Sequence, residues 1–286
     1  MIRVLALLLL AALSGCGPAA LALTERGGEP AGALRPTIVS LNPCSDAVLA
    51  EVAAPGQLLA ISSYSHDPAS SSMDPALARR FRSVSGSVEE IAALSPDVVV
   101  AGSMVSPATA SALEQLGIRL VRLPIAHDIA ASKAQVRNLA ALSGQKAKGE
   151  AMVRRIEAAL AKAAPPAGAA PVEAIVWESG GIVAGDDTLI ADILKRTGFA
   201  NGAAARGLGQ AQYLPLERML ASPPQVILES GDARSDEDRL LSHPALASLK
   251  NTRRARLDPA LLWCGGPTIV RAADRLAEVR RGGASQ

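Results

Sequence analysis

Three cysteines, Cys16, Cys44 and Cys264, are the residues here whose chemistry depends most on their surroundings. Cys44 and Cys264 each stand at the end of a predicted strand and before a predicted helix, one in each half of the chain. A helix amino terminus lowers the pKa of a thiol. Three interpretations stay open for this pair: a disulfide, if their Cα atoms lie within about 7 Å, contact with a ligand or metal, or two inert apolar side chains.

The three histidines, His66, His127 and His243, are scattered along the chain. None has a carboxylate or a second histidine at zinc-ligand spacing, so the sequence predicts neither a metal site nor a resident cofactor. A lone loop histidine is usually solvated. His66 nevertheless follows Tyr64 by two residues in a polar loop, and it is kept as a candidate ligand contact.

No motif of a known catalytic class is found. A Gly-x-Ser-x-Gly nucleophile elbow is absent from the sequence. Residues 178–185 are glycine-rich, but their spacing fits neither a Walker A loop nor a dinucleotide fingerprint. We expect a loop or hairpin there and predict that the chain is not an enzyme. An exported enzyme and an envelope sensor remain alternatives, because fold does not fix function.

The composition narrows the class of protein. With 286 residues the chain forms one large or two modest domains. It is 49% hydrophobic but only 2% aromatic, which is typical of α/β folds with buried parallel strands. The 29 basic and 27 acidic residues leave a net charge of +2, so no electrostatic footprint for nucleic acid exists.

Residues 1–16 are predicted to be a lipoprotein-type signal peptide. Arg3 is followed by an apolar stretch that is too short to span a bilayer. Leu13-Ser14-Gly15-Cys16 resembles a bacterial lipobox, which would make Cys16 the lipidated residue and the lipid the only membrane anchor. Cleavage after Ala22 and a retained anchor remain alternatives. All three place the folded part in the periplasm or its equivalent, where the two remaining cysteines form an even number.

Residues 17–35 are rich in Gly, Ala and Pro and are predicted to be a flexible tether. From residue 36, strands and helices alternate, which predicts an α/β fold of two Rossmann-like lobes with parallel sheets. We expect an N-terminal lobe over 36–127, a helical connection over 128–164 and a C-terminal lobe over 171–286. Residues 146–163 form one long connecting helix with an apolar face.

The other elements are expected as follows. Strands are predicted at 37–41, 58–61, 98–101, 118–123, 174–177 and 226–228. Helices are predicted at 44–54, from Pro75 onward, and at 88–94, 107–116, 129–142, 188–196, 216–221, 236–249 with a break at Pro244, and 268–281.

An internal repeat supports two related lobes. Residues 88–100 match residues 216–228 without a gap, at a constant offset of 128. In each copy an acidic residue opens a short helix, a proline ends it and a buried strand follows. The alternative is a chance match between two common helix–strand units. Two lobes joined by one helix leave a cleft between them, where ligands bind near the carboxyl ends of parallel strands.

Four segments resemble the helical-backbone class (class III) of periplasmic substrate-binding proteins of ABC importers, which includes cobalamin and ferric-siderophore binders. They are Ile38-Val39-Ser40-Leu41-Asn42-Pro43, Ala60-Ile61-Ser62-Ser63-Tyr64-Ser65, residues 89–100, and Trp263-Cys264-Gly265-Gly266-Pro267. The resemblance spans roughly residues 36–281.

The resemblance implies a monomer that binds a small molecule between its lobes and delivers it to the transmembrane subunits of an ABC permease. It also implies that one glutamate on each lobe docks on that permease. Glu89 and Glu217 stand at the matching positions. Acidic residues favour the first turn of any helix, so neither glutamate requires a partner.

The implied ligand is a corrinoid or a ferric siderophore, with haem as the alternative. Tyr64 matches the cobalamin binder, whereas small residues such as Ser85 and Gly102 stand near the expected places of other aromatic rings. Candidate ligand contacts in the predicted cleft loops or among the aromatic residues are Asn42, Cys44, Tyr64, His66, Gly102, Trp177, Tyr213, Trp263 and Cys264. For Trp177, Tyr213 and Trp263 a position in the core is the alternative.

Overall fold

The computed structural model describes residues 35–231 and 239–282. The predicted signal peptide, Cys16 and nearly all of the tether lie outside the described residues. The described residues belong to one compact unit that begins at Arg35. Within these two ranges, no helix is long and apolar enough to cross a membrane.

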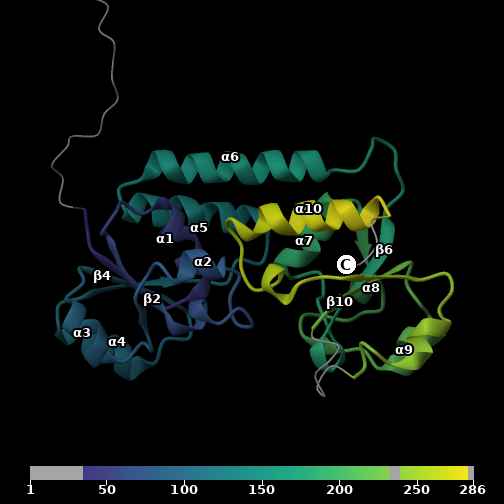
Figure 1. Ribbon diagram of the computed structural model, residues 1–286, viewed down its shortest axis with the longest axis horizontal. Coiled ribbons are helices and arrows are strands. Elements are labelled where there is room, and N and C mark those ends of the chain that lie inside the picture. The colour runs from purple at the N-terminus through teal and green to yellow at the C-terminus, as the bar shows by residue number, and fades with distance from the viewer. Residues whose placement is uncertain (1–34, 232–238, 283–286) are drawn as a thin grey trace, which may run out of the picture. The chain divides into compact units, whose positions relative to one another are not determined.

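The first lobe is built on a five-stranded parallel sheet of order β3-β2-β1-β4-β5 (Figure 1). Its strands are β1 (Ile38–Ser40), β2 (Leu58–Ser62), β3 (Ser83–Val84), β4 (Val98–Gly102) and β5 (Arg119–Leu123). The connecting helices are α1 (Pro43–Val52), α2 (Pro75–Ala78), α3 (Val88–Leu94) and α4 (Pro107–Gln115), with a 3₁₀ turn η1 (Ser63–His66) after β2. The predicted parallel α/β lobe is therefore confirmed.

The second lobe has a mixed sheet. Strands β6 (Val172–Glu178), β8 (Phe199–Asn201), β10 (Val226–Ser230) and β11 (Arg253–Arg256) are parallel. Two short strands, β7 (Ile182–Val183) and β9 (Gln212–Tyr213), extend it in antiparallel fashion. The predicted parallel sheet thus forms the centre of this lobe, and the glycine-rich segment after β6 returns through the 3₁₀ turn η2 (Ser179–Gly181) as the expected hairpin. The helices are α7 (Leu189–Arg196), α8 (Gly202–Ala205), α9 (Leu216–Ala221) and α10 (Thr268–Arg280).

The repeat has a structural counterpart. In the first lobe α3 leads into β4, which pairs with β1; in the second α9 leads into β10, which pairs with β6. Asp97, before β4, accepts hydrogen bonds from the backbone N–H and the hydroxyl of Thr37 at 2.7 and 2.8 Å. Gln225 takes the same place before β10, and its Oε1 accepts from the backbone N–H of Glu173 at 2.8 Å. The lobes therefore share one folding unit.

One apolar core runs through both lobes beneath the connecting helices α5 (Ile129–Leu142) and α6 (Lys146–Ala163). It joins one face of each sheet, for example Val98 and Val226, to Ile156 of α6. The other face of each sheet has its own apolar cluster. The cluster of the first lobe lies under α3 and α4, and that of the second lobe lies under α9. In Figure 1, α6 lies along the top of the two lobes, and α3 and α9 lie at the bottom, on the side opposite α6. A core shared in this way resists large hinge motions of the lobes.

Several parts of the second lobe differ from expectation, and β8, β9 and α8 were not predicted. The helix predicted at 236–249 is absent from the described residues 239–249, which contain only the 3₁₀ helix Pro244–Ser248 (η4). Strand β11 was not predicted, because its sequence Arg-Arg-Ala-Arg lacks an apolar run. Only Ala255 is buried there, and Arg254 forms an ion pair with Glu229 on the neighbouring strand.

Candidate ligand-binding site

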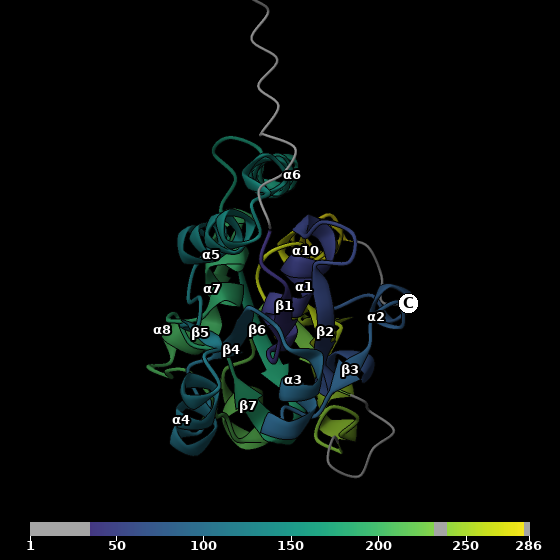
Figure 2. The ribbon, with the colours of Figure 1, turned by 90° about the vertical axis from the view of Figure 1, so that its left-hand side faces the viewer.

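The carboxyl ends of the strands in the first sheet face the second lobe. Cys44 follows β1 and is bonded to Cys264 of the second lobe. His127 follows β5, and its Nδ1 donates to the carbonyl oxygen of Asp187 at 3.2 Å. These contacts place the loops after the parallel strands at the boundary between the lobes, which is where open α/β sheets bind ligands. Figure 2 shows the first lobe from its outer side.

Large apolar side chains are exposed at these strand ends. Tyr64 after β2 is 62% exposed, Met104 after β4 is 92% exposed and Trp263 before α10 is 53% exposed. Tyr213, 53% exposed, pairs with Ile182 of β7 beside the turn that follows β6. Exposed aromatic and Met side chains are typical of a binding surface for an apolar ligand. Met104 was missed as a candidate because a methionine in a short loop gives no distinctive sequence signal.

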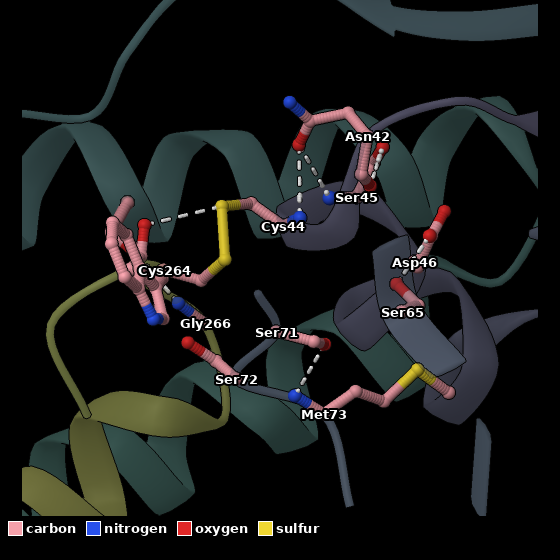
Figure 3. Close-up of a disulfide and its surroundings, with 12 residues drawn as sticks. Asn42, Cys44, Ser45, Asp46, Ser65, Ser71, Ser72, Met73, Cys264 and Gly266 are labelled. Atoms are coloured by element: carbon pink, nitrogen blue, oxygen red, sulfur yellow. Dashed lines mark hydrogen bonds between the residues drawn. A yellow bond between two sulfur atoms is a disulfide. The ribbon is translucent and has the colours of Figure 1, made fainter. Parts of the chain in front are cut away.

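A buried carboxylate holds the turn that carries Tyr64. Oδ2 of Asp46, in α1, accepts hydrogen bonds from the backbone N–H of Ser62 at 2.9 Å and from the hydroxyl of Ser65 at 2.6 Å (Figure 3). Asp46 is fully buried, and its Oδ1 has no hydrogen-bond partner among the described residues. Burial raises the pKa of Asp46 to about 7, although contacts with Ser40, Ser65 and Ser62 oppose that rise. Asp46 therefore fixes both flanks of Tyr64.

The imidazole of His66 is already engaged with the protein. Its Nε2 lies 3.1 Å from the carbonyl oxygen of Ala78 and 3.2 Å from that of Phe81. Carbonyl oxygens only accept, so Nε2 carries the proton and donates to them. This nitrogen ties the Tyr64 turn to the end of α2 and is not available as a ligand to iron. A role for His66 in ligand contact stays a prediction that rests on Nδ1.

Asn42 and Gly102 meet at the ends of β1 and β4. Oδ1 of Asn42 caps α1 by accepting from the backbone N–H groups of Cys44 and Ser45 at 2.9 and 3.3 Å. A Cβ on Gly102 would lie 2.9 Å from Nδ2 of Asn42, so this position requires a small residue. Nδ2 itself has no partner among the described residues and is free to donate to a ligand.

Trp177 is not a ligand contact in this structure, and the prediction for it was wrong. Its side chain is 0% exposed and packs in the core of the second lobe with Met219 and Ile227. The sequence could not distinguish this core position on β6 from a strand-end position, because the strand continues for one residue beyond Trp177.

The disulfide joins the amino terminus of α1 to the loop before α10. Cys44 and Cys264 have Cα atoms 5.0 Å apart and are separated by 220 residues in sequence. Figure 3 shows the bond with Gly266 beside it. The backbone N–H of Gly266 donates to the hydroxyl of Ser132, on α5, at 2.8 Å. Of the three interpretations of these cysteines, the structure has the disulfide.

The loop after β10 includes Arg239, and the other described strand-end loops carry no Lys or Arg. This holds for residues 41–42, 63–74, 103–106, 124–128, 179–181 and 257–267. Glu178, at the carboxyl end of β6, is half-buried, and burial raises its pKa. Arg271 of α10 also donates to the carbonyl oxygen of Ser72 in the loop after β2, so this surface has few cations rather than none. Such a surface binds neutral or cationic ligands better than anionic ones, because little there offsets the desolvation of a carboxylate.

Three cavities lie mostly away from these loops, although the first includes Pro124 and Ile125 of the loop after β5. One of about 720 Å³ lies between β5 and α5, one of about 660 Å³ beside α4 and one of about 410 Å³ among α5, α6 and Arg196. None of the three is lined by a predicted ligand contact. In the part of the chain that the structure describes, no group of three or more metal-binding side chains is found.

The predicted docking residues lie in matching places. Glu89 and Glu217 occupy the first turns of α3 and α9, and both are exposed. Neither forms a hydrogen bond or ion pair with another described residue. Figure 1 places α3 and α9 on the side of the two lobes away from α6. The helix dipole alone accounts for acidic residues at these positions, but not for their symmetry.

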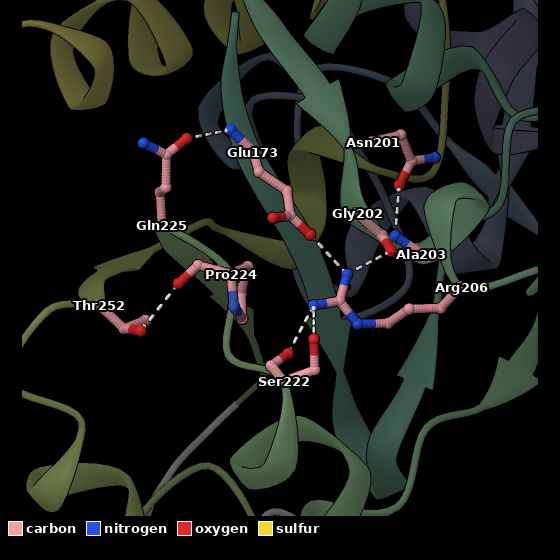
Figure 4. A network of polar contacts seen from close by, with 9 residues as sticks. All are labelled: Glu173, Asn201, Gly202, Ala203, Arg206, Ser222, Pro224, Gln225 and Thr252. Atoms are coloured by element: carbon pink, nitrogen blue, oxygen red, sulfur yellow. Dashed lines mark hydrogen bonds and ion pairs between the residues drawn. The ribbon is translucent and has the colours of Figure 1, made fainter.

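An arginine network fixes α9 (Figure 4). Nη1 of Arg206 donates to Glu173 on β6 at 2.5 Å and to the carbonyl oxygen of Gly202 at 2.6 Å. Nη2 donates to the carbonyl oxygen of Ser222, the residue that ends α9, at 2.5 Å. The orientation of the helix that bears Glu217 is thus tied to the central strand of its lobe.

Solved structures with the same fold bind haem or vitamin B12. The periplasmic haem-binding protein of Vibrio cholerae matches with a TM-score of 0.69 and 19% identity, over 85% of this chain and 98% of its own. The periplasmic vitamin B12-binding protein of Vibrio cholerae matches with a TM-score of 0.63 and 17% identity, over 87% and 98%. The periplasmic haem-binding protein of Roseiflexus sp. RS-1 matches with a TM-score of 0.66 and 21% identity, over 86% of this chain and 97% of its own.

At these identities the likeness establishes the two-lobed fold and leaves the ligand open. No curated protein matches the sequence. A family model described as periplasmic binding protein matches residues 38–261, most of the chain and all of both sheets. The chain therefore belongs to the periplasmic binding protein family and, with it, to the class III binding proteins that act outside the cytoplasm.

Proposed function

We propose that this protein captures a corrinoid between its two lobes and delivers it to the transmembrane subunits of an ABC importer. The observation that carries the choice of ligand is a set of exposed apolar side chains: Tyr64, Met104 and Trp263 on loops without Lys or Arg, and Tyr213 on β9. A corrinoid presents a broad apolar ring edged with neutral amides and bears little net charge. It needs flat apolar contacts and hydrogen-bond donors, and Nδ2 of Asn42 is one such donor.

Haem suits these loops less well. Its two propionates are anionic, and the loops that carry Tyr64, Met104 and Trp263 have no Lys or Arg of their own to pair with them. Tyr64 has an exposed hydroxyl-bearing ring that could reach iron, which keeps haem as the second candidate. A ferric siderophore remains the third, because many such chelates also present an apolar surface.

The proposal also covers membrane anchoring, oligomeric state and contact with the permease. It is held at the membrane by lipid on Cys16, acts as a monomer, and meets the permease through Glu89 and Glu217. The exposure of both glutamates and their freedom from internal partners support this role. The fold family supports ligand binding without chemistry, so we propose no catalytic activity.

Titration of the purified, oxidised protein with dicyanocobinamide, cyanocobalamin and haemin tests the ligand. Each absorbs visible light, so bound and free forms are measured directly by equilibrium dialysis. We expect saturable one-to-one binding of a corrinoid, and at least tenfold weaker binding of haemin. Tighter binding of haemin than of either corrinoid would contradict the proposal. If none of the three binds, the same dialysis with ferric siderophores decides whether the protein takes an iron chelate instead.

A further inference from the structure

The segment that carries Trp263 belongs to the second lobe in sequence but is fastened to the first. We define residues 263–267 as the strap. Cys264 of the strap is bonded to Cys44 at the amino terminus of α1. Gly266 of the strap donates its N–H to Ser132 on α5. After Pro267 the chain enters α10, which packs on α6 and in the second lobe.

The strap lies against the first lobe without space for a side chain. A Cβ on Gly265 would lie 2.2 Å from Oγ of Ser132, and one on Gly266 would lie 2.7 Å from Cγ2 of Val48. Gly266 also has a φ of +60°, a conformation that favours glycine. The two glycines therefore allow the backbone of the strap to approach α1 and α5 closely enough for the disulfide to form.

The indole of Trp263 is half exposed and has no polar partner among the described residues. It is 53% exposed, and no hydrogen bond of its Nε1 is found within the described residues. Its backbone lies beside the disulfide, since the carbonyl oxygen of Trp263 is 3.4 Å from Sγ of Cys44. The bond of the neighbouring Cys264 thus restrains the backbone that carries this exposed ring.

We propose that the Cys44–Cys264 disulfide is a positioning element of the ligand site: it holds Trp263 on the first lobe, so that the ligand meets a preset aromatic surface. This inference rests on the proposed binding function and adds a specific role for the bond. A ring that is already in place saves the ordering cost that a mobile side chain would incur on binding. Small movements of the second lobe leave Trp263 next to the edge that Asn42 and Cys44 form.

The test uses the two tryptophans as reporter and control. The protein is labelled with 5-fluorotryptophan, and the ¹⁹F resonance of Trp263 is assigned with the Trp263→Phe variant. Buried Trp177 is the internal control. Oxidised protein is compared with the Cys44→Ser/Cys264→Ser double variant and with protein treated with dithiothreitol. That dithiol gives two electrons and two protons to the bond, so two cysteine thiols form and the reagent closes to a cyclic disulfide.

We expect the Trp263 resonance to shift and narrow when the bond is absent, while the Trp177 resonance stays in place. We also expect the affinity for dicyanocobinamide to fall at least tenfold and to return on reoxidation. A merely structural bond would change both resonances together or neither. An unchanged Trp263 resonance, or unchanged affinity in the double variant, would overturn the proposal. If wild-type protein binds no corrinoid, the proposed function fails, but the ¹⁹F comparison still decides whether the bond positions Trp263.

Discussion

Cys44 and Cys264, whose Cα atoms lie 5.0 Å apart, join the two lobes covalently at the point where their strand-end loops meet. The connecting helix α6 makes ion pairs to both lobes on the opposite side, through Arg155 to Glu51 and through Lys162 to Asp274. Besides their shared core, the lobes are therefore linked by a helix on one side and by a disulfide on the other. This arrangement favours ligand capture by a largely preformed site over wide domain closure.

Loss of the disulfide should lower the stability of the folded protein. The bond closes a sequence separation of 220 residues, and the chain-entropy treatment gives about 5 kcal/mol for such a loop. Native-state relaxation reduces this, so we expect about 2–5 kcal/mol of lost unfolding free energy. Urea unfolding of oxidised and reduced wild-type protein, monitored by circular dichroism, measures the difference. The Cys44→Ser/Cys264→Ser variant should match reduced protein, and equal midpoints for oxidised and reduced protein would refute the expectation.

Asp46 should make stability depend on pH. The Asp carboxyl group is ionised in the unfolded chain above about pH 4, whereas in the folded protein its pKa is raised to about 7. Between these values the folded state binds one more proton, so its stability falls as pH rises from about 4 to about 7, by at most about 1.4 kcal/mol per unit. Above pH 7 the contribution is constant.

The Asp46→Asn variant isolates this effect. One amide oxygen can accept from both Ser62 and Ser65, as Oδ2 of Asp46 does, but the amide does not titrate. The difference in unfolding free energy between wild type and Asp46→Asn should therefore decline over pH 4–7 and then stay level. Asp46→Ala should weaken binding by releasing the Tyr64 turn. A pH-independent difference would show that Asp46 is not protonated in the folded state.

Arg206 should stabilise the second lobe. Its side chain is only 12% exposed and serves three acceptors, on Glu173, Gly202 and Ser222. Arg206→Met leaves these acceptors unpaired, and we expect a loss of about 2–4 kcal/mol. Arg206→Lys keeps the charge but cannot reach all three residues. Its unfolding free energy should therefore lie between those of wild type and Arg206→Met. Urea unfolding midpoints of the three proteins measure these differences. If Arg206→Met is as stable as wild type, water replaces the network without loss of stability.

Removal of both exposed docking glutamates should abolish transport and leave ligand affinity unchanged. The paired change Glu89→Ala/Glu217→Ala removes two carboxylates that have no internal partner, so the fold should be unaffected. Uptake of labelled cobinamide by cells that carry the cognate permease measures the effect. Glu114→Ala, on the exposed surface of α4, is the matched control and should transport normally. Normal uptake by the double variant would argue for a sensor rather than an importer component.

Much of the fold was predictable because its signals are local. The apolar face of residues 146–163 and the break at Pro165 gave the bounds of α6 as the structure has them. The gapless repeat predicted that α3–β4 and α9–β10 are equivalent, and Asp97 and Gln225 share one hydrogen-bonding role. Strand β11 was missed because a strand at the sheet edge, with three of its four residues arginine, depends on pairing with β10.

The site was less predictable, because exposure is a property of the folded chain. Trp177 and Trp263 both stand near strand ends in sequence, yet one is fully buried and the other is 53% exposed. Asp46 reads as an ordinary acidic residue in the first turn of a helix, and only the fold shows that it is buried against the Tyr64 turn. The disulfide was one of three open interpretations, because a separation of 220 residues gives no information on distance.

The central claim, that a corrinoid binds against the exposed aromatic side chains at the strand ends, is tested most directly by a double variant. Dicyanocobinamide affinity is measured by equilibrium dialysis for wild type, for Tyr64→Ala/Trp263→Ala and for Leu116→Ala, a control that removes an apolar side chain 52% exposed at the end of α4. Loss of two aromatic contacts at about 1–2 kcal/mol each predicts a fall in affinity of about thirtyfold or more in the double variant. Leu116→Ala should bind as wild type does. Equal affinity in all three proteins would contradict the account.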